Sequence, residues 1–211
     1  TSEFDPVGAT GIPVDGDRKT RSENLIGKLV VTAATFDDRV LWRMSGSYFE
    51  SEHRNFVDGS ADSMTASERL SFSLQAAIEL GQNRLVLAAE REESDFKRRG
   101  EVVFGDPNQD QSMQVSSAVV EYQHLAMERL TLLLSGRFDN SSDFDDAATG
   151  RVSLAWQAGA YTRLRASVGS GQKSPTFTER FGLFPGQFVG NPDLKPEKSL
   201  AYEMGISRSL F

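Results

Sequence analysis

Apolar and polar residues alternate along most of this 211-residue chain, and this period of two constrains its fold more than any other feature. Between Leu70 and Ile78 every second residue is apolar, while Ser71, Ser73 and Gln75 lie between them. Such alternation is typical of a β-strand with one apolar and one polar face. Similar segments occur at residues 25–34, 40–50, 85–96, 113–125, 130–138, 152–156, 164–168 and 200–206. The sequence therefore predicts an all-β, antiparallel up-and-down meander of about nine strands.

The connections between these segments alternate in length. Short turns are predicted at residues 36–39, 81–84, 126–129 and 158–161, and long polar loops at 52–68, 98–112, 140–147 and 172–199. Successive connections of a meander lie at opposite ends, so all short turns share one end. This asymmetry is typical of a bacterial outer-membrane barrel, whose long loops lie outside the cell. A soluble antiparallel sheet or lipocalin-like barrel shows the same alternation, so periodicity alone leaves both open.

The composition leaves little material for catalysis. The chain has no cysteine, which excludes thiol nucleophiles, zinc-thiolate sites and iron-sulfur clusters, and its two histidines, His53 and His124, are far apart in sequence. The formal net charge is -7 and the basic residues are dispersed, which argues against nucleic-acid binding. The longest unbroken apolar run, at residues 85–89, is too short for a membrane-spanning helix, which needs about 20 residues. We expect no enzyme activity, no cofactor and no metal site.

Several local features allow a chemical and a simpler interpretation. The aspartates between residues 139 and 146 could bind calcium, but they lack EF-hand spacing, and a solvated loop is the favoured interpretation. Glu90 and Glu92 could act as an acid-base pair, although residues two apart on a strand share one face and suit a hydrated lumen wall. Gly169 and Gly171 precede no helix and suit a flexible strand end. His53 is expected to begin a polar loop.

The segment from residue 163 to residue 206 carries a longer motif. It contains Ser174-Pro175, then Glu-Arg-Phe-Gly at 179–182, then Asn-Pro-Asp-Leu-Lys-Pro-Glu-Lys-Ser at 191–199. This arrangement resembles the barrel of TonB-dependent outer-membrane receptors, with the vitamin B12 and siderophore receptors nearest in layout. The positions that match the family signature are Ser174, Pro175, Asn191, Pro192, Leu194, Pro196, Glu197 and Ser199. Gly-Arg-Phe-Asp at 136–139 also resembles this family.

The resemblance implies a larger barrel than the chain can form. Plugged outer-membrane transporters typically have about 22 strands, and the family places a plug domain and an energy-coupling box before the barrel. Neither is found here. Tyr202, Met204 and Ile206 share one face and Phe211 lies on the other, so a proper final strand is not expected. We therefore interpret residues 1–211 as an interior part of a transmembrane β-barrel domain.

The resemblance also implies a function in the bacterial outer membrane. Receptors of this family import a scarce, bulky solute such as a ferric siderophore or cobalamin, with energy from the TonB complex acting on the plug. The implied partners are a metal chelate or other small-molecule ligand, outer-membrane lipid and the TonB complex. A passive porin or adhesin-like barrel should lack the signature at 191–199. A soluble β-rich ligand-binding domain should purify without detergent.

Aromatic and cationic residues cluster in the loop predicted at 172–199. Rings beside cations suit a flat, anionic or aromatic chelate through stacking and charge pairing. The alternative is that the rings pack the loop against the barrel rim. Arg180 is the strongest candidate, because a guanidinium can pair with carboxylate or catecholate oxygens while lying over a ring. The expected ligand contacts are Lys173, Phe177, Arg180, Phe181, Phe184 and Phe188.

Overall fold

The computed structural model describes residues 2–3, 17–102, 105–184 and 188–210, so the terminal Phe211 lies outside the described residues. The chain forms one antiparallel sheet in the order β1-β2-β3-β4-β5-β6-β7-β8-β9-β12 and a separate β10-β11 hairpin. The predicted antiparallel meander with nine long strands is confirmed. The elements are β1 (Ser2–Glu3), β2 (Arg18–Thr35), β3 (Val40–Val57), β4 (Ser60–Leu80), β5 (Asn83–Gly100), β6 (Gln109–Ala126), β7 (Leu130–Ser141), β8 (Ala147–Gln157), β9 (Thr162–Lys173), α1 (Phe177–Phe181), β10 (Leu183–Phe184), β11 (Phe188–Val189) and β12 (Glu197–Arg208).

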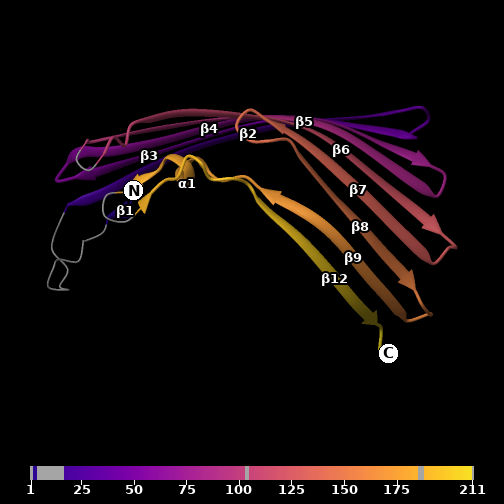
Figure 1. Cartoon of the computed structure of the whole chain (residues 1–211). Helices are drawn as coiled ribbons and strands as arrows, with labels where there is room; N and C mark the ends of the chain where they lie inside the picture. The colour runs from indigo at the N-terminus through magenta and orange to yellow at the C-terminus, as the bar shows by residue number, and fades with distance from the viewer. Residues whose placement is uncertain (1, 4–16, 103–104, 185–187, 211) are drawn as a thin grey trace.

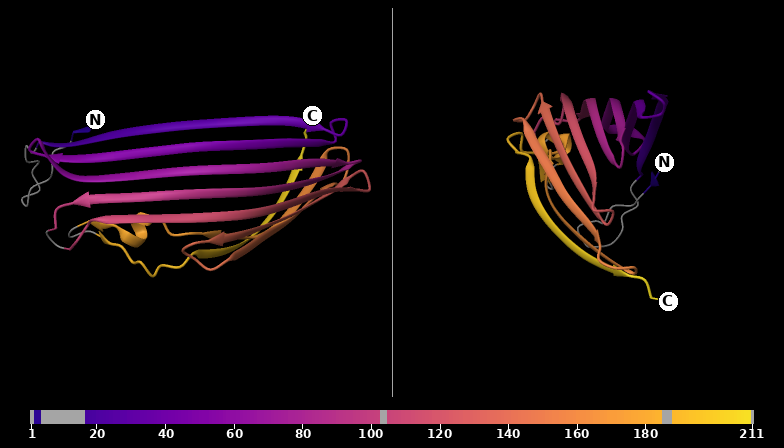
Figure 2. Two further views of the ribbon diagram at one scale, coloured as in Figure 1. Left: turned by 90° about the horizontal axis from the view of Figure 1, so that it is seen from above. Right: turned by 90° about the vertical axis from the view of Figure 1, so that its right-hand side faces the viewer.

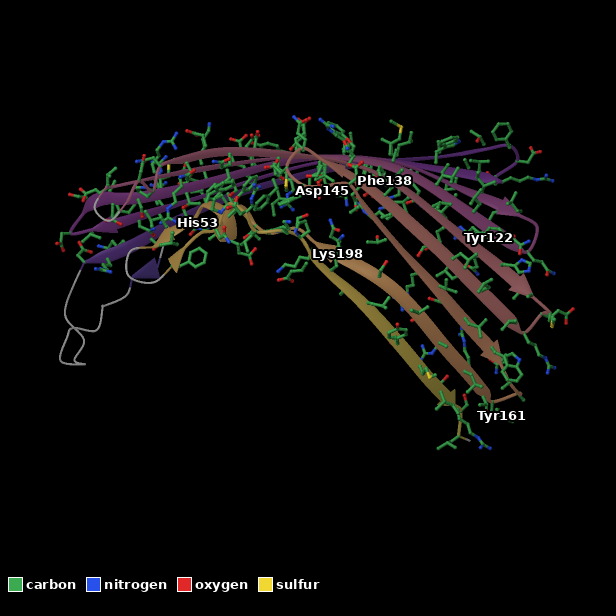
Figure 3. All side chains as sticks on the ribbon, in the orientation of Figure 1. His53, Tyr122, Phe138, Asp145, Tyr161 and Lys198 are labelled. Atoms are coloured by element: carbon green, nitrogen blue, oxygen red, sulfur yellow. The ribbon has the colours of Figure 1, made fainter. Side chains whose placement is uncertain are left out.

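The sheet is a single curved layer, and α1 lies on its concave side (Figures 1 and 2). The short connections 36–39, 81–82, 127–129 and 158–161 share one end, the turn end, which Tyr122 and Tyr161 mark in Figure 3. The connections 58–59, 101–108, 142–146 and 174–196 share the other, the loop end. The predicted segregation of short and long connections therefore holds for three of the four loop-end connections.

The prediction of a long loop at residues 52–68 is wrong. There β3 and β4 stay paired and close in a two-residue turn at Asp58 and Gly59, whose φ angles are 49° and 76°. Asp-Gly is a strong hairpin signal because both positions of a type I′ turn need a positive φ. His53 consequently lies within β3, where its ring nitrogens contact Ser22 Oγ at 2.8 Å and Ser51 Oγ at 3.1 Å. Gly169 and Gly171, expected at a flexible strand end, likewise lie inside the paired part of β9.

Residues that pair directly across strands share a face of the sheet, so the register assigns the two faces. One row on the convex face reads Val31, Met44, Leu74, Ala89, Ala118 and Phe138 across β2 to β7. The adjacent row on the concave face reads Val30, Ser45, Ser73, Glu90, Ser117 and Asp139. The convex face is thus apolar and the concave face mostly polar.

The convex apolar band has the height of a bilayer core. At about 3.4 Å per residue and a tilt of about 40°, residues 70–80 of β4 rise roughly 26 Å, against about 25 Å for the apolar band of outer-membrane barrels. Towards the loop end the band stops on neighbouring strands at charged residues, including Glu50, Arg91 and Glu93. Beyond them both faces are polar, which explains why strand alternation is lost at 52–68.

The described part of the sheet buries few apolar side chains and has almost no hydrophobic core. The buried apolar residues among those described are Ala76, Ala77, Phe96 and Ala147, while the large apolar side chains of the convex face are half-buried or exposed. A contiguous apolar face of this size in one layer needs an apolar partner. No helix in the described segments is both long enough and apolar enough to span a membrane.

Candidate functional site

The 174–196 loop turns back along the concave face at the loop end and carries α1 (Figures 1 and 2). Thr176 caps the helix: its hydroxyl accepts a hydrogen bond from Glu179 N at 3.2 Å, and its own N–H donates to Glu179 Oε2 at 2.7 Å. This reciprocal pair is a capping box, which the Thr-x-x-Glu spacing signals in sequence. The helix stops at Gly182, where an added Cβ would lie 2.5 Å from the carbonyl oxygen of Thr178.

An aromatic contact joins this loop to β5. The ring of Phe177 stacks on that of Phe96, with centroids 5.5 Å apart and an interplanar angle of 14°. Phe96 projects from the concave face of β5 and is only 4% exposed. At least one face of the Phe177 ring therefore packs against the sheet and holds the loop there.

Arg180 connects three separate segments, and we call this group the Arg180 clasp. Its Nη1 donates to Asp143 Oδ1 at 2.9 Å in the β7-β8 connection, and its Nε donates to the carbonyl oxygen of Pro192 at 3.3 Å. The guanidinium carbon lies 4.9 Å from the ring centroid of Phe144 and 4.7 Å from that of Phe181. The side chains of Arg180 and Asp143 are 12% and 21% exposed. The clasp comprises Asp143, Phe144, Arg180, Phe181 and Pro192.

The family-like signature at 191–199 forms the return path from α1 to β12. Asn191 N donates to the carbonyl oxygen of Glu179 at 3.0 Å, and Asn191 Oδ1 accepts from Asp193 N at 3.0 Å. Ser199 pairs with Gly171 of β9, where an added Cβ would lie 3.0 Å from Ser199 Oγ. In this structure the signature residues shape the backbone of the loop.

The expected ligand contacts occupy different environments. Phe177, Arg180 and Phe181 take part in the packing just described, and the structure gives them intramolecular partners. Lys173 is exposed at the end of β9, and Phe188 is 39% exposed in β11. The side chain of Phe184 lies outside the described part of the chain. Their contact with a ligand stays a prediction.

Midway along the concave wall lies an ion-pair network that the sequence analysis did not identify. Arg137 donates to Glu90 Oε2, to Asp139 Oδ1 and to Ser117 Oγ, each at 2.7 Å. Glu92 lies on the same face of β5 as Glu90, as expected for a hydrated wall. The signal available in sequence was Gly-Arg-Phe-Asp at 136–139, in which residues 137 and 139 share a face. The network links β5, β6 and β7 without enclosing a site for chemistry.

The aspartates between residues 139 and 146 have different partners and do not form one cluster. Asp139 pairs with Arg137, Asp143 with Arg180, and Asp146 Oδ1 accepts from Asn140 Nδ2 at 2.7 Å. Within the described ranges, no three His, Asp or Glu side chains are arranged to hold a metal ion. These carboxylates instead stabilise the loop end.

The capping box makes the order of α1 depend on pH. The backbone N–H and hydroxyl of Thr176 hold the pKa of the Glu179 carboxyl below its ordinary value of 4.5. Because the pKa is lower in the folded state, the stabilising contribution is complete above the unfolded value and is lost as pH falls through the folded value. The protection of the amides of residues 176–182 from hydrogen exchange, measured relative to the intrinsic exchange rate at each pH, should therefore decrease as the pH falls below the ordinary value of 4.5. In Glu179→Gln, where the amide oxygen still accepts, this pH dependence should vanish; if it persists, another group is responsible.

Comparisons with known proteins agree with this geometry. A family model described as "TonB dependent receptor-like, beta-barrel" matches residues 7–211. The vitamin B12 transporter BtuB of Photobacterium profundum is 22% identical over 91% of this chain, and the match covers 30% of that relative. The siderophore receptor PirA of Pseudomonas aeruginosa superimposes with a TM-score of 0.75 at 17% identity, over 93% of this chain and 38% of that one. The copper transporter OprC gives 0.72 at 18% identity, over 92% and 37%. These structural matches show the fold, and the chain spans about a third of the length of the proteins it matches.

Proposed function

Because the chain belongs to the TonB-dependent receptor β-barrel family, we propose that it forms an arc of the wall of an active transporter for a scarce, bulky solute. Barrels of this family lie in the bacterial outer membrane, and the family consists of transporters and not enzymes. The observation that carries the proposal is the family match over residues 7–211, on a sheet whose convex band has bilayer height. The loop end then faces the outside of the cell.

Metal chelates are the favoured solutes. Proteins similar to this chain are named as a vitamin B12 transporter, a siderophore receptor and a copper transporter. We propose a ferric siderophore, cobalamin or a related chelate as the cargo, and the TonB complex, acting through a plug domain of the intact receptor, as the energy source.

The 174–196 loop is proposed to form part of the surface that captures the ligand. Lys173 and Phe188 are exposed near the loop end, on the side from which a ligand would arrive. Phe177 and the Arg180 clasp hold the backbone between them in place. Arg180 is thus proposed to act in capture chiefly by positioning this loop.

Energised uptake by the intact receptor tests this function. Cells producing it should accumulate labelled cobalamin or an iron-labelled siderophore, and cells lacking the TonB protein should bind the same solute without accumulating it. The reason is that a plugged receptor opens only when work is done on its plug. Uptake at the same rate in both strains would instead support the passive porin, which shares the strand pattern.

A further inference from the structure

A shallow hollow of about 450 Å³ lies on the convex face, within the apolar band of β2, β3, β4 and β5. It forms where two small residues, Gly46 and Ala89, stand among large ones on neighbouring strands. Because it faces away from the lumen, neither a plug nor the opposite wall of a barrel can fill it. The large apolar side chains around it are between 43% and 70% exposed, which leaves them open to an apolar occupant: Leu29, Met44, Phe72 and Leu74.

Gly46 keeps the hollow open. It pairs with Leu29 of β2 and Phe72 of β4, and an added Cβ would lie 3.5 Å from Cε1 of the Phe72 ring. A larger side chain at residue 46 would therefore occupy the space. Glycine inside a strand weakens it and often marks a bulge or a site that another molecule approaches closely. A bulge is not the reason here, because the register shift between β3 and β4 lies farther along, at Asn55 and Phe56.

Arg91 lies at the loop-end edge of the hollow, directly across from Phe72. Its guanidinium turns towards the loop end, where Nη2 donates to Glu93 Oε1 at 3.2 Å. Nη1 donates to Ser116 Oγ at 2.8 Å and has no other partner among the described residues. Since a guanidinium has five N–H donors, Nη1 keeps a second donor for another acceptor. A cationic side chain whose stem lies on apolar surface while its head reaches the polar layer is typical of a membrane boundary.

We propose that this hollow binds one phosphate-bearing lipid of the outer leaflet, with a hydrocarbon chain over Gly46 and Ala89 and the phosphate at Arg91. The hollow is continuous with the lipid face of the barrel, so a hydrocarbon chain is the occupant that its surroundings supply. Chains alone give little selectivity, because lipid tails are as apolar as leucine side chains. Selection among lipids comes from Arg91, whose planar donors match phosphate oxygens. The inference goes beyond transport, since it concerns the outer wall and not the path of the solute.

Diphosphorylated lipid A is a suitable probe for the intact receptor in detergent micelles, with bound lipid counted by native mass spectrometry. Wild type should retain one molecule of it and should bind the dephosphorylated lipid A more weakly. G46L should weaken this binding by about tenfold or more, because the leucine fills the space of the chain. R91Q should weaken it by about tenfold, because a hydrogen bond to a charged group is lost.

The same face offers a matched control for each variant. Gly136 is a glycine on the convex face of β7, outside the hollow, where an added Cβ would lie 3.6 Å from Val120. Arg99 lies on the same face of β5 as Arg91, outside the hollow, and is paired with Asp110. G136L and R99Q should each bind lipid A like wild type.

Lipid A binding that neither G46L nor R91Q weakens would overturn the proposal, and so would equal binding of the dephosphorylated lipid by wild type. Weakening by G46L alone would show a hollow for any hydrocarbon chain, and receptor dimers that only G46L abolishes would show a second copy as the occupant. Both results contradict the proposed lipid. Should R91Q lose the folded barrel, as judged by heat-modifiability in gels, R91K decides. It keeps the charge without the planar fork and should weaken the binding severalfold, whereas unchanged binding would reject Arg91 as the phosphate contact.

Discussion

Arginine at the centre of the convex apolar band should destabilise the folded barrel by about 2–4 kcal/mol, the cost of an arginine at the bilayer midplane on the lipid face of such a barrel. Leu74 is the position where we expect the full effect. It lies in the middle of residues 70–80 of β4, and its cross-strand neighbours Met44 and Ala89 are uncharged. No charge of opposite sign is therefore beside it to compensate a guanidinium.

Ser73→Arg is the matched control for Leu74→Arg. Ser73 is adjacent in sequence but lies on the concave face beside Ser45 and Glu90, where a cation meets polar groups. Urea titration of the intact receptor refolded in lipid vesicles measures both variants. We expect a lowered free energy of unfolding for Leu74→Arg and a change within about 1 kcal/mol for Ser73→Arg. Equal losses at both positions would indicate a soluble, two-sided core and contradict the membrane assignment.

The strand pattern could be predicted from sequence only where the two faces of the sheet meet different solvents. Around Leu74 one face is apolar and the other polar, so the period of two is visible. Beyond Glu50 and Glu68 both faces are polar, the period disappears, and a paired hairpin has the composition of a loop. The Asp-Gly pair at 58–59 was the local signal for that hairpin, because it supplies the left-handed backbone a two-residue turn needs.

Contacts in the candidate site could likewise be predicted from sequence only where the partners are close together in the chain. The capping box of Thr176 and Glu179 depends on residues three apart and can be predicted from spacing. The partners of Arg180 in the β7-β8 connection, Asp143 and Phe144, are more than thirty residues away in sequence, and only the fold brings them together. The sequence therefore favoured Arg180 as a ligand contact, and nothing in it could indicate the clasp.

Replacing Arg180 with alanine should release the 174–196 loop while leaving the barrel folded. The change removes the ion-pair partner of Asp143, a carboxylate only 21% exposed, and the cation that contacts the rings of Phe144 and Phe181. Breaking a largely buried ion pair costs on the order of 3 kcal/mol, because one charge stays behind without compensation. Here that cost falls on local opening of the loop, since no contact of the clasp lies within the paired part of the sheet.

Limited proteolysis of the intact receptor and whole-cell ligand binding test the clasp together. In R180A, cleavage within residues 174–196 should accelerate by about tenfold or more and ligand binding should fall, with heat-modifiability of the barrel in gels unchanged. Lys195→Ala removes an exposed cation from the same loop and should leave both measurements near wild type. R180K keeps the charge without the planar fork and should fall between wild type and R180A. A loop that stays protected in R180A while binding is lost would show that Arg180 contacts the ligand directly. Protection and binding both retained would mean that Phe177 on Phe96 and the backbone contacts of Asn191 hold the loop without it.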